Sequence, residues 1–232
     1  MSAIYNLGKE PLNLSIIEEI IECNKKLALN KEVKNKISDC REFLDKKILS
    51  HKEPLYGINT GFGSLCDYKI NNNDINKLQE NLVLSHACGT GEVVPFEIVK
   101  IMMLLKIQSL SFGYSGVQLK TVNRLIDMFN NNIMPIVYQQ GSLGASGDLA
   151  PLAHMSLPLI GQGEVNIPGI CDNGYYKKRK SSQILKEMNW EEIKLKSKEG
   201  LALLNGTQFM SAYAIWSLLK SKRLSYFADM IG

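Results

Sequence analysis

The sequence predicts a mainly α-helical protein. Apolar residues recur every three or four positions in several long segments, whereas very few stretches alternate as a half-buried strand would. One run, "PFEIVKIMMLLKIQSL", is apolar on nearly every side, which is typical of a helix at the centre of a bundle. With 232 residues, of which 45% are hydrophobic, the chain can bury a sizeable core.

Two helices are predicted near the start of the chain. The first begins at Ser15, where Glu18 three positions later completes a capping box, and its apolar face continues as far as Leu27. The second runs from Val33 to Ile48, with apolar residues spaced by three or four. After them, the segment 53–65 carries three glycines and a proline, which predicts a structured loop.

Helical periodicity returns at 74–86 and stops at the glycines of "ACGTG". Pro95 is suited to the first turn of the next, fully apolar helix, and "VQLKTVNRLIDMFN" predicts another amphipathic one. The segment "MPIVYQQG" is the best candidate for a short strand, and 161–176 predicts a turn-rich or short β excursion. A tight turn at Asn205 and Gly206 then leads into a long apolar helix near the C-terminus.

The composition argues against several classes of protein. A net charge of +4 is mild, with lysines interleaved among acidic residues, so nothing demands a nucleic acid or a membrane as partner. Five cysteines form an odd, widely spaced set without a CxxC pair, which predicts free thiols in a reducing cytoplasm. The N-terminus resembles no signal peptide, and the histidines are too scattered to suggest a metal site. We therefore expect a soluble, cytoplasmic protein without a metal.

The most unusual segment is "GSLGASGDLAPLAHMS", residues 141–156, in which Ala145, Ser146 and Gly147 stand together. It could be a loop that enters a helix, with Ser146 or Asp148 as the N-cap. It does not match the GxSxG frame of a hydrolase nucleophile, and the chain has no GxxxxGK[ST] phosphate loop.

Small residues also permit a rarer reaction. The nitrogen of Gly147 is unhindered and the carbonyl of Ala145 is little shielded, so the backbone could close into a five-membered ring. Ring closure would release one water, and loss of the Ser146 hydroxyl would release a second. The product would carry an exocyclic methylene, which is an electrophile. The positive end of a following helix would stabilise negative charge near the ring.

This segment closely resembles the signature of the aromatic amino acid ammonia-lyases and related aminomutases. In that family the tripeptide becomes 4-methylidene-imidazol-5-one (MIO), which implies that Ala145, Ser146 and Gly147 form this prosthetic group autocatalytically here. "YGINTGFG" is similar to the loop with the catalytic tyrosine, which implies Tyr56 as the general base. "GLALLNGT" is similar to the segment whose asparagine binds the substrate carboxylate, which implies this role for Asn205.

The residues also have plainer interpretations. Tyr56 alone could be a half-buried loop aromatic, although a glycine-rich loop can aim its hydroxyl. Asn205 could simply form a turn, and Asp148 is most simply a helix N-cap or first-turn acid that also assists ring formation. His154 is interpreted as a structural residue of a buried helix face.

The Ser85-His86 pair in "NLVLSHACGTG" resembles the version found in histidine-specific members of the family. There the histidine contacts the imidazole, so the resemblance implies that His86 binds L-histidine, from which ammonia is eliminated to give urocanate. A plainer interpretation makes His86 a cation at a helix C-terminus. Another aromatic lyase or an aminomutase is the alternative activity, and a non-catalytic fragment is the alternative to an enzyme.

The resemblance also implies an organisation. We expect an MIO-bearing domain of helices and loops with little strand at 1–199, followed at 200–232 by the start of a long central helical bundle. Family members are much longer and form homotetramers. The large apolar residues of the last helix accordingly predict either an oligomer or a missing C-terminal half that covers them.

Overall fold

The computed structural model describes residues 3–8, 11–50, 53–71, 74–143, 147–171 and 174–232, with the side chains of 170–175 outside this description. As predicted, it is mainly α-helical. The α-helices are α1 (Leu14–Glu22), α2 (Lys31–Ser50), α3 (Ile75–His86), α4 (Phe96–Ser111), α5 (Leu119–Asn130), α6 (Leu149–Ser156), α7 (Ser181–Glu187), α8 (Glu199–Leu204) and α9 (Gln208–Ile231). Short 3₁₀ helices occupy Gly63–Leu65 (η1) and Leu157–Ile160 (η2).

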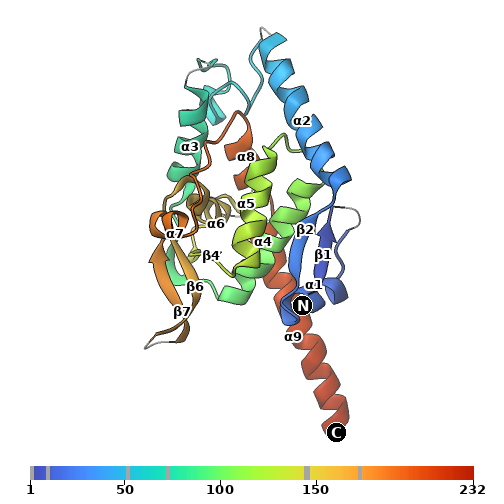
Figure 1. Cartoon of the computed structure of the whole chain (residues 1–232). Helices are drawn as coiled ribbons and strands as arrows, with labels where there is room; N and C mark the ends of the chain where they lie inside the picture. The colour runs from blue at the N-terminus through green and yellow to red at the C-terminus, as the bar shows by residue number, and fades with distance from the viewer. Residues whose placement is uncertain (1–2, 9–10, 51–52, 72–73, 144–146, 172–173) are drawn as a thin grey trace.

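Helix α4 lies at the centre of the protein, as its apolar sequence predicts (Figure 1). Helices α1, α2, α5 and α9 all pack against it, so nearly every side of α4 is buried. The buried residues include Lys100 and Lys106, whose ammonium groups therefore need polar partners inside the protein.

The prediction for the first helix is partly wrong. Helix α1 begins after Asn13, whose side chain accepts a hydrogen bond from the N–H of Ile16 (2.9 Å), so Asn13 and not Ser15 is the N-cap. The helix ends at Glu22, and Asn24 adopts a positive φ of 47° that reverses the chain. Strand β2 (Lys26–Leu29) follows and pairs in parallel with β1 (Ile4–Leu7). Leu27 is therefore buried by strand alternation and not by helical periodicity.

The strands are short and form three small sheets. The predicted strand 134–141 splits into β4 (Met134–Pro135) and β5 (Tyr138–Gln140), which belong to different sheets. The former pairs with the hairpin β6 (Glu164–Cys171) and β7 (Gly174–Lys180), which is the predicted β excursion in a longer form. The latter pairs with β3 (Thr90–Val93) and so brings the chain that leaves α3 alongside the chain that enters the 141–156 segment.

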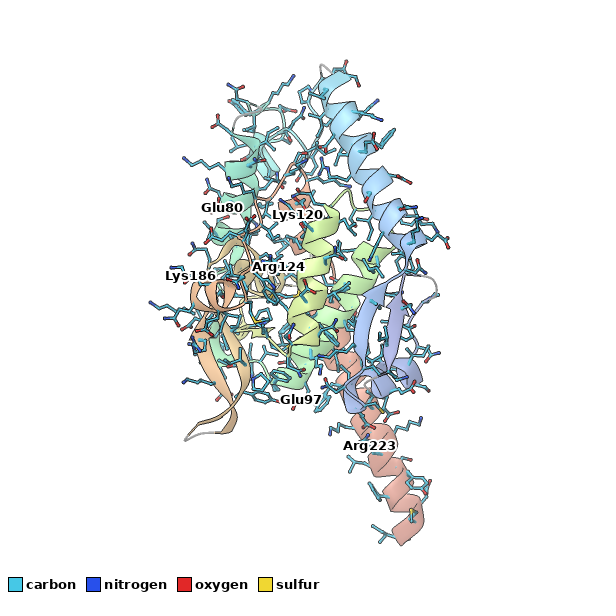
Figure 2. All side chains as sticks on the ribbon, in the orientation of Figure 1. Glu80, Glu97, Lys120, Arg124, Lys186 and Arg223 are labelled. Carbon is cyan, nitrogen blue, oxygen red and sulfur yellow. The ribbon has the colours of Figure 1, made fainter. Side chains whose placement is uncertain are left out.

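Helix α9 packs on α4 with its first half and extends beyond the body of the protein with its second (Figure 1). Arg223, on this projecting part, forms ion pairs with Glu18 and Glu22 of α1 (Figure 2). Beyond Arg223 every residue of α9 is exposed, and several are large and apolar: Leu224, Tyr226, Phe227, Met230 and Ile231. This face is therefore available for contact with other helices.

Among the described helices, none combines the length and the hydropathy that crossing a lipid bilayer requires. No cluster of His, Cys, Asp and Glu side chains suited to a metal ion occurs in the described part of the chain either. Cys23, Cys40, Cys66 and Cys88 are free thiols.

Candidate active site

The end of the Ala-Ser-Gly segment lies directly against the Asn205-Gly206 turn. Ala145 and Ser146 lie outside the described residues, but Gly147 is described and has a φ of 101°. A Cβ atom at Gly147 would lie 2.5 Å from the carbonyl oxygen of Gly206, which is closer than such contacts allow. That same oxygen accepts the N–H of Asp148 at 2.8 Å. Only glycine therefore fits at position 147.

Asp148 joins two helices. It occupies the N-cap position of α6, yet its side chain makes no capping bond to that helix. Its fully buried carboxylate accepts instead from the N–H of Met210, in the first turn of α9 (2.9 Å), and from the hydroxyl of Ser142 (3.2 Å). Asp148 thus stands at the N-cap position of α6, as predicted. Its carboxylate, however, bonds to the first turn of α9 and not to that of α6.

Asn205 is the C-cap residue of α8, and its side chain is exposed beside Gly206. Its backbone carbonyl accepts a hydrogen bond from the ammonium of Lys106, at 3.0 Å. The sequence contains one signal for Lys106, which is a charged residue inside a run that is mostly apolar. That signal does not identify the partner, which lies 99 positions further along the chain.

His86 is the last residue of α3 and is half-buried. Its Nδ1 lies 2.9 Å from the carbonyl oxygen of Leu82, and a carbonyl can only accept, so Nδ1 carries the proton. In the neutral ring Nε2 is therefore a hydrogen-bond acceptor. Next to His86 the surface forms an open depression of about 550 Å³, lined by residues of α3 and of the 61–70 segment, including Phe62 and Tyr68.

Tyr56 lies in a loop that its own side chains hold in shape. Asn59 and Thr60 are buried and accept hydrogen bonds from the N–H groups of Leu55 (2.6 Å) and Gly57 (3.3 Å). The Tyr56 ring meets the edge of Phe62 at a centroid distance of 6.1 Å and is 59% exposed. The loop is thus ordered by its own hydrogen bonds, and the Tyr56 side chain is largely accessible from solvent.

Close contacts at glycine positions connect these four segments. At Gly57 an added Cβ would lie 2.5 Å from Leu201, so the Tyr56 loop lies on α8 and hence near the Asn205 turn. At Gly141 an added Cβ would lie 2.9 Å from the Cα of Gly89, so the chain after His86 lies on the start of the 141–156 segment. The structure therefore brings the segments that carry Tyr56, His86, Gly147 and Asn205 into one region.

His154 has a more specific role than the buried helix face predicted for it. Its Nε2 accepts the N–H of Gly89 at 2.9 Å, and its ring meets the edge of Tyr138 at 5.2 Å. Since Gly89 follows His86 by three positions, His154 of α6 holds the chain that leaves the end of α3. Burial lowers the pKa of His154 below its usual 6.5, which keeps Nε2 free to accept.

From the hydrogen bond between Gly89 and His154 we expect the folded protein to lose stability in acid. The unfolded chain takes up a proton at His154 below pH 6.5, whereas the folded chain resists it, so stability present above that pH is lost as the pH falls. His154→Gln keeps an acceptor but does not titrate. We expect the thermal midpoint to fall more steeply between about pH 7 and pH 5 in the wild type than in this variant. Equal slopes would contradict the assignment.

Comparisons with known proteins identify the family to which this chain belongs. The sequence profile of the family described as "Aromatic amino acid lyase" matches residues 12–232. The chain is 42% identical to histidine ammonia-lyase of Legionella pneumophila (strain Corby) over 232 residues, which are 100% of this chain and 44% of that protein. This chain therefore spans less than half the length of that relative.

Two solved structures share the fold. Histidine ammonia-lyase from Trypanosoma cruzi superposes with a TM-score of 0.85 and 32% identity, over 97% of this chain and 43% of that one. Phenylalanine aminomutase from Pantoea agglomerans gives a TM-score of 0.85 and 29% identity, over 96% of this chain and 41% of that one. The profile match covers nearly the whole chain, so this protein belongs to the aromatic amino acid lyase family.

Proposed function

We propose that residues 1–232 form the electrophile-bearing part of a histidine ammonia-lyase, which converts L-histidine to urocanate and ammonia without oxidation. The observation that supports the proposal is the contact between Gly147 and the Asn205-Gly206 turn, because it joins the segment for which we propose ring formation to the asparagine for which we propose carboxylate binding. The identity to a relative named histidine ammonia-lyase, along the whole of this chain, supports it.

The residues around the tripeptide fit an MIO group. Position 147 accepts only glycine, and the next N–H, that of Asp148, is fixed by the carbonyl of Gly206. Helix α6 starts immediately afterwards, so its positive end faces the segment. When formed, MIO supplies an electrophilic methylene for the substrate amine.

Three side chains have separate roles toward the substrate. The phenolic oxygen of Tyr56, in its deprotonated form, acts as the general base that removes the proton from the β-carbon of histidine. The amide of Asn205 binds the substrate carboxylate. His86 faces the imidazole with Nε2, because Leu82 already occupies its Nδ1; it therefore accepts the substrate's ring N–H.

We further propose how this part belongs to a larger assembly. Residues 1–199 constitute the MIO-bearing domain, and 200–232 begin a central helical bundle of a cytoplasmic homotetramer. The exposed apolar end of α9 supports this, because bundle helices bury such faces against one another. The free thiols are compatible with a reducing compartment.

Intact mass spectrometry tests the proposal on this chain. Ring formation removes two waters, so the mature protein should weigh two waters less than its sequence, and Ser146→Ala should show no such deficit. Urocanate absorbance, followed in the same sample with L-histidine, reports turnover. A wild-type chain at its full sequence mass would contradict the proposal. A chain with the deficit but no turnover would confirm MIO formation and show that 1–232 lacks groups needed for elimination.

An aminomutase is the second candidate, since the phenylalanine aminomutase superposes as well as the histidine ammonia-lyase does. Product analysis separates the two. L-Histidine should yield urocanate and free ammonia, whereas L-phenylalanine converted to a β-amino acid without ammonia release would favour the aminomutase. His86→Leu should weaken the use of histidine selectively if Nε2 reads the imidazole.

A further inference from the structure

Lys106 is a buried cation that the proposed chemistry leaves without a role. It lies in the last turns of α4 and is only 1% exposed, among the largest fully buried side chains of the described residues. No carboxylate in the described part of the chain forms an ion pair with it. Its ammonium instead donates to the backbone carbonyl of Asn205, at 3.0 Å.

That carbonyl belongs to the turn that supports the ring-forming segment. The next carbonyl along the chain, that of Gly206, accepts the N–H of Asp148 at 2.8 Å and closely approaches Gly147. Two consecutive carbonyls of the turn thus have different donors. The Asn205 carbonyl is bonded to Lys106 of the core helix α4, and the Gly206 carbonyl is bonded to Asp148 at the start of α6. The bond from Lys106 therefore helps to fix the Asn205-Gly206 peptide, whose nitrogen would lie 3.3 Å from a Cβ at Gly147 and which directly precedes the peptide that carries the Gly206 carbonyl.

We propose that Lys106 is a positioning residue: its ammonium fixes the Asn205-Gly206 turn so that Gly147 and Asp148 are held in the geometry that ring formation needs. The effect of Lys106 on ring formation rests on the proposed function. The hydrogen-bonded arrangement itself is a property of this chain that can be measured separately.

The energetics of burial argue against a purely stabilising role. Burial lowers the pKa of Lys106 from 10.5 to about 7, because no charge nearby compensates for the loss of water. The unfolded chain binds this proton up to pH 10.5, so the cost of burying a cation is greatest below about pH 7 and is relieved as the pH rises to 10.5. An apolar side chain of similar volume would avoid this cost.

Lys100 offers a matched control on the same helix. It is 6% exposed, and burial lowers its pKa to about 8. Its ammonium donates to the side-chain oxygens of Asn24 (2.7 Å) and Asn132 (2.8 Å), in turns that lie apart from the Asn205-Gly206 turn. Lys100→Met thus removes a buried cation from α4 without removing the bond to Asn205.

The experiment compares Lys106→Met, Lys100→Met and wild type as full 232-residue chains. Three quantities are measured: the thermal midpoint at pH 7, the fraction of protein with the two-water deficit, and amide hydrogen exchange of 147–152. For Lys106→Met we expect an unchanged or higher midpoint, a mature fraction reduced about tenfold and exchange about tenfold faster, since the substitution removes the donor that holds the Asn205 carbonyl. Lys100→Met should mature and exchange in 147–152 like the wild type.

The outcomes separate the two proposals. Wild-type maturation and exchange in folded Lys106→Met would overturn the role of Lys106, as would equal effects of both substitutions. If Lys106→Met does not fold, Lys106→Gln replaces it, because a glutamine keeps a neutral N–H donor and should show the same changes to a smaller extent. A wild type without the mass deficit contradicts the proposed function, while the exchange comparison still decides whether Lys106 orders this turn.

Discussion

Gly147→Ala is expected to abolish the two-water mass deficit and to destabilise the protein by about 3 kcal/mol or more. The backbone at φ 101° is strained for any residue with a Cβ, and this Cβ would lie 2.5 Å from the Gly206 oxygen. Relief of that overlap pushes the 147 backbone away from the turn and breaks the bond from Asp148 to Gly206. Intact mass and chemical denaturation measure the two effects on one sample.

Gly63→Ala is the control for backbone strain. Gly63 also has a positive φ, of 58°, but an added Cβ would meet nothing within 4 Å. We therefore expect a loss of only about 1–2 kcal/mol, from the left-handed conformation alone, with ring formation retained. If Gly147→Ala matured normally and matched Gly63→Ala in stability, the contact with Gly206 would not constrain the segment.

Asp148→Ala is expected to lower the free energy of unfolding by about 2–4 kcal/mol and to impair ring formation. The substitution leaves the N–H of Met210 and the hydroxyl of Ser142 without the acceptor that the buried Asp148 carboxylate supplies. It also releases α9 from the start of α6. Denaturant unfolding gives the first effect, and the mature fraction by mass gives the second.

A local helix cap provides the comparison. Asn13→Ala removes a single capping bond at the start of α1, where the N–H of Ile16 is exposed to solvent. We expect a loss of about 1 kcal/mol and full maturation. Asp148→Asn, which keeps an acceptor for Met210, should lie between these two variants. Equal losses for Asn13→Ala and Asp148→Ala would show that the bond between the helices adds nothing beyond an ordinary cap.

The spacing of apolar residues predicts those helices and strands that have the same kind of surroundings along their whole length. Helix α4 is surrounded by other helices, so its apolar residues signal both its type and its central place. Periodicity does not predict the correct element at Leu27. Over a segment as short as β2, the apolar residues fit a strand as well as a helix. The pairing with β1, far back in the chain, decides between them.

Some residues of the candidate site could be proposed from the sequence, and others could not. Tyr56, His86 and Asn205 stand in short segments that resemble the family, so they could be proposed from the sequence. The roles of Lys106, His154 and the Asp148 carboxylate depend on partners 99, 65 and 62 positions away. No local pattern carries such information, since a lysine in an apolar run or an acid at a helix start is compatible with many partners.

The bond from Asp148 to α9 also bears on when the chain can mature. Its donor, Met210, is synthesised 62 residues after Asp148, and the turn against which Gly147 rests comes nearly as late. A nascent chain that has passed Ser156 holds the whole tripeptide but neither the Gly206 carbonyl nor the Met210 N–H, to which Asp148 is bonded in the folded protein. On the proposed function, cyclisation therefore waits for tertiary structure, so the reactive electrophile arises only in molecules that have already folded.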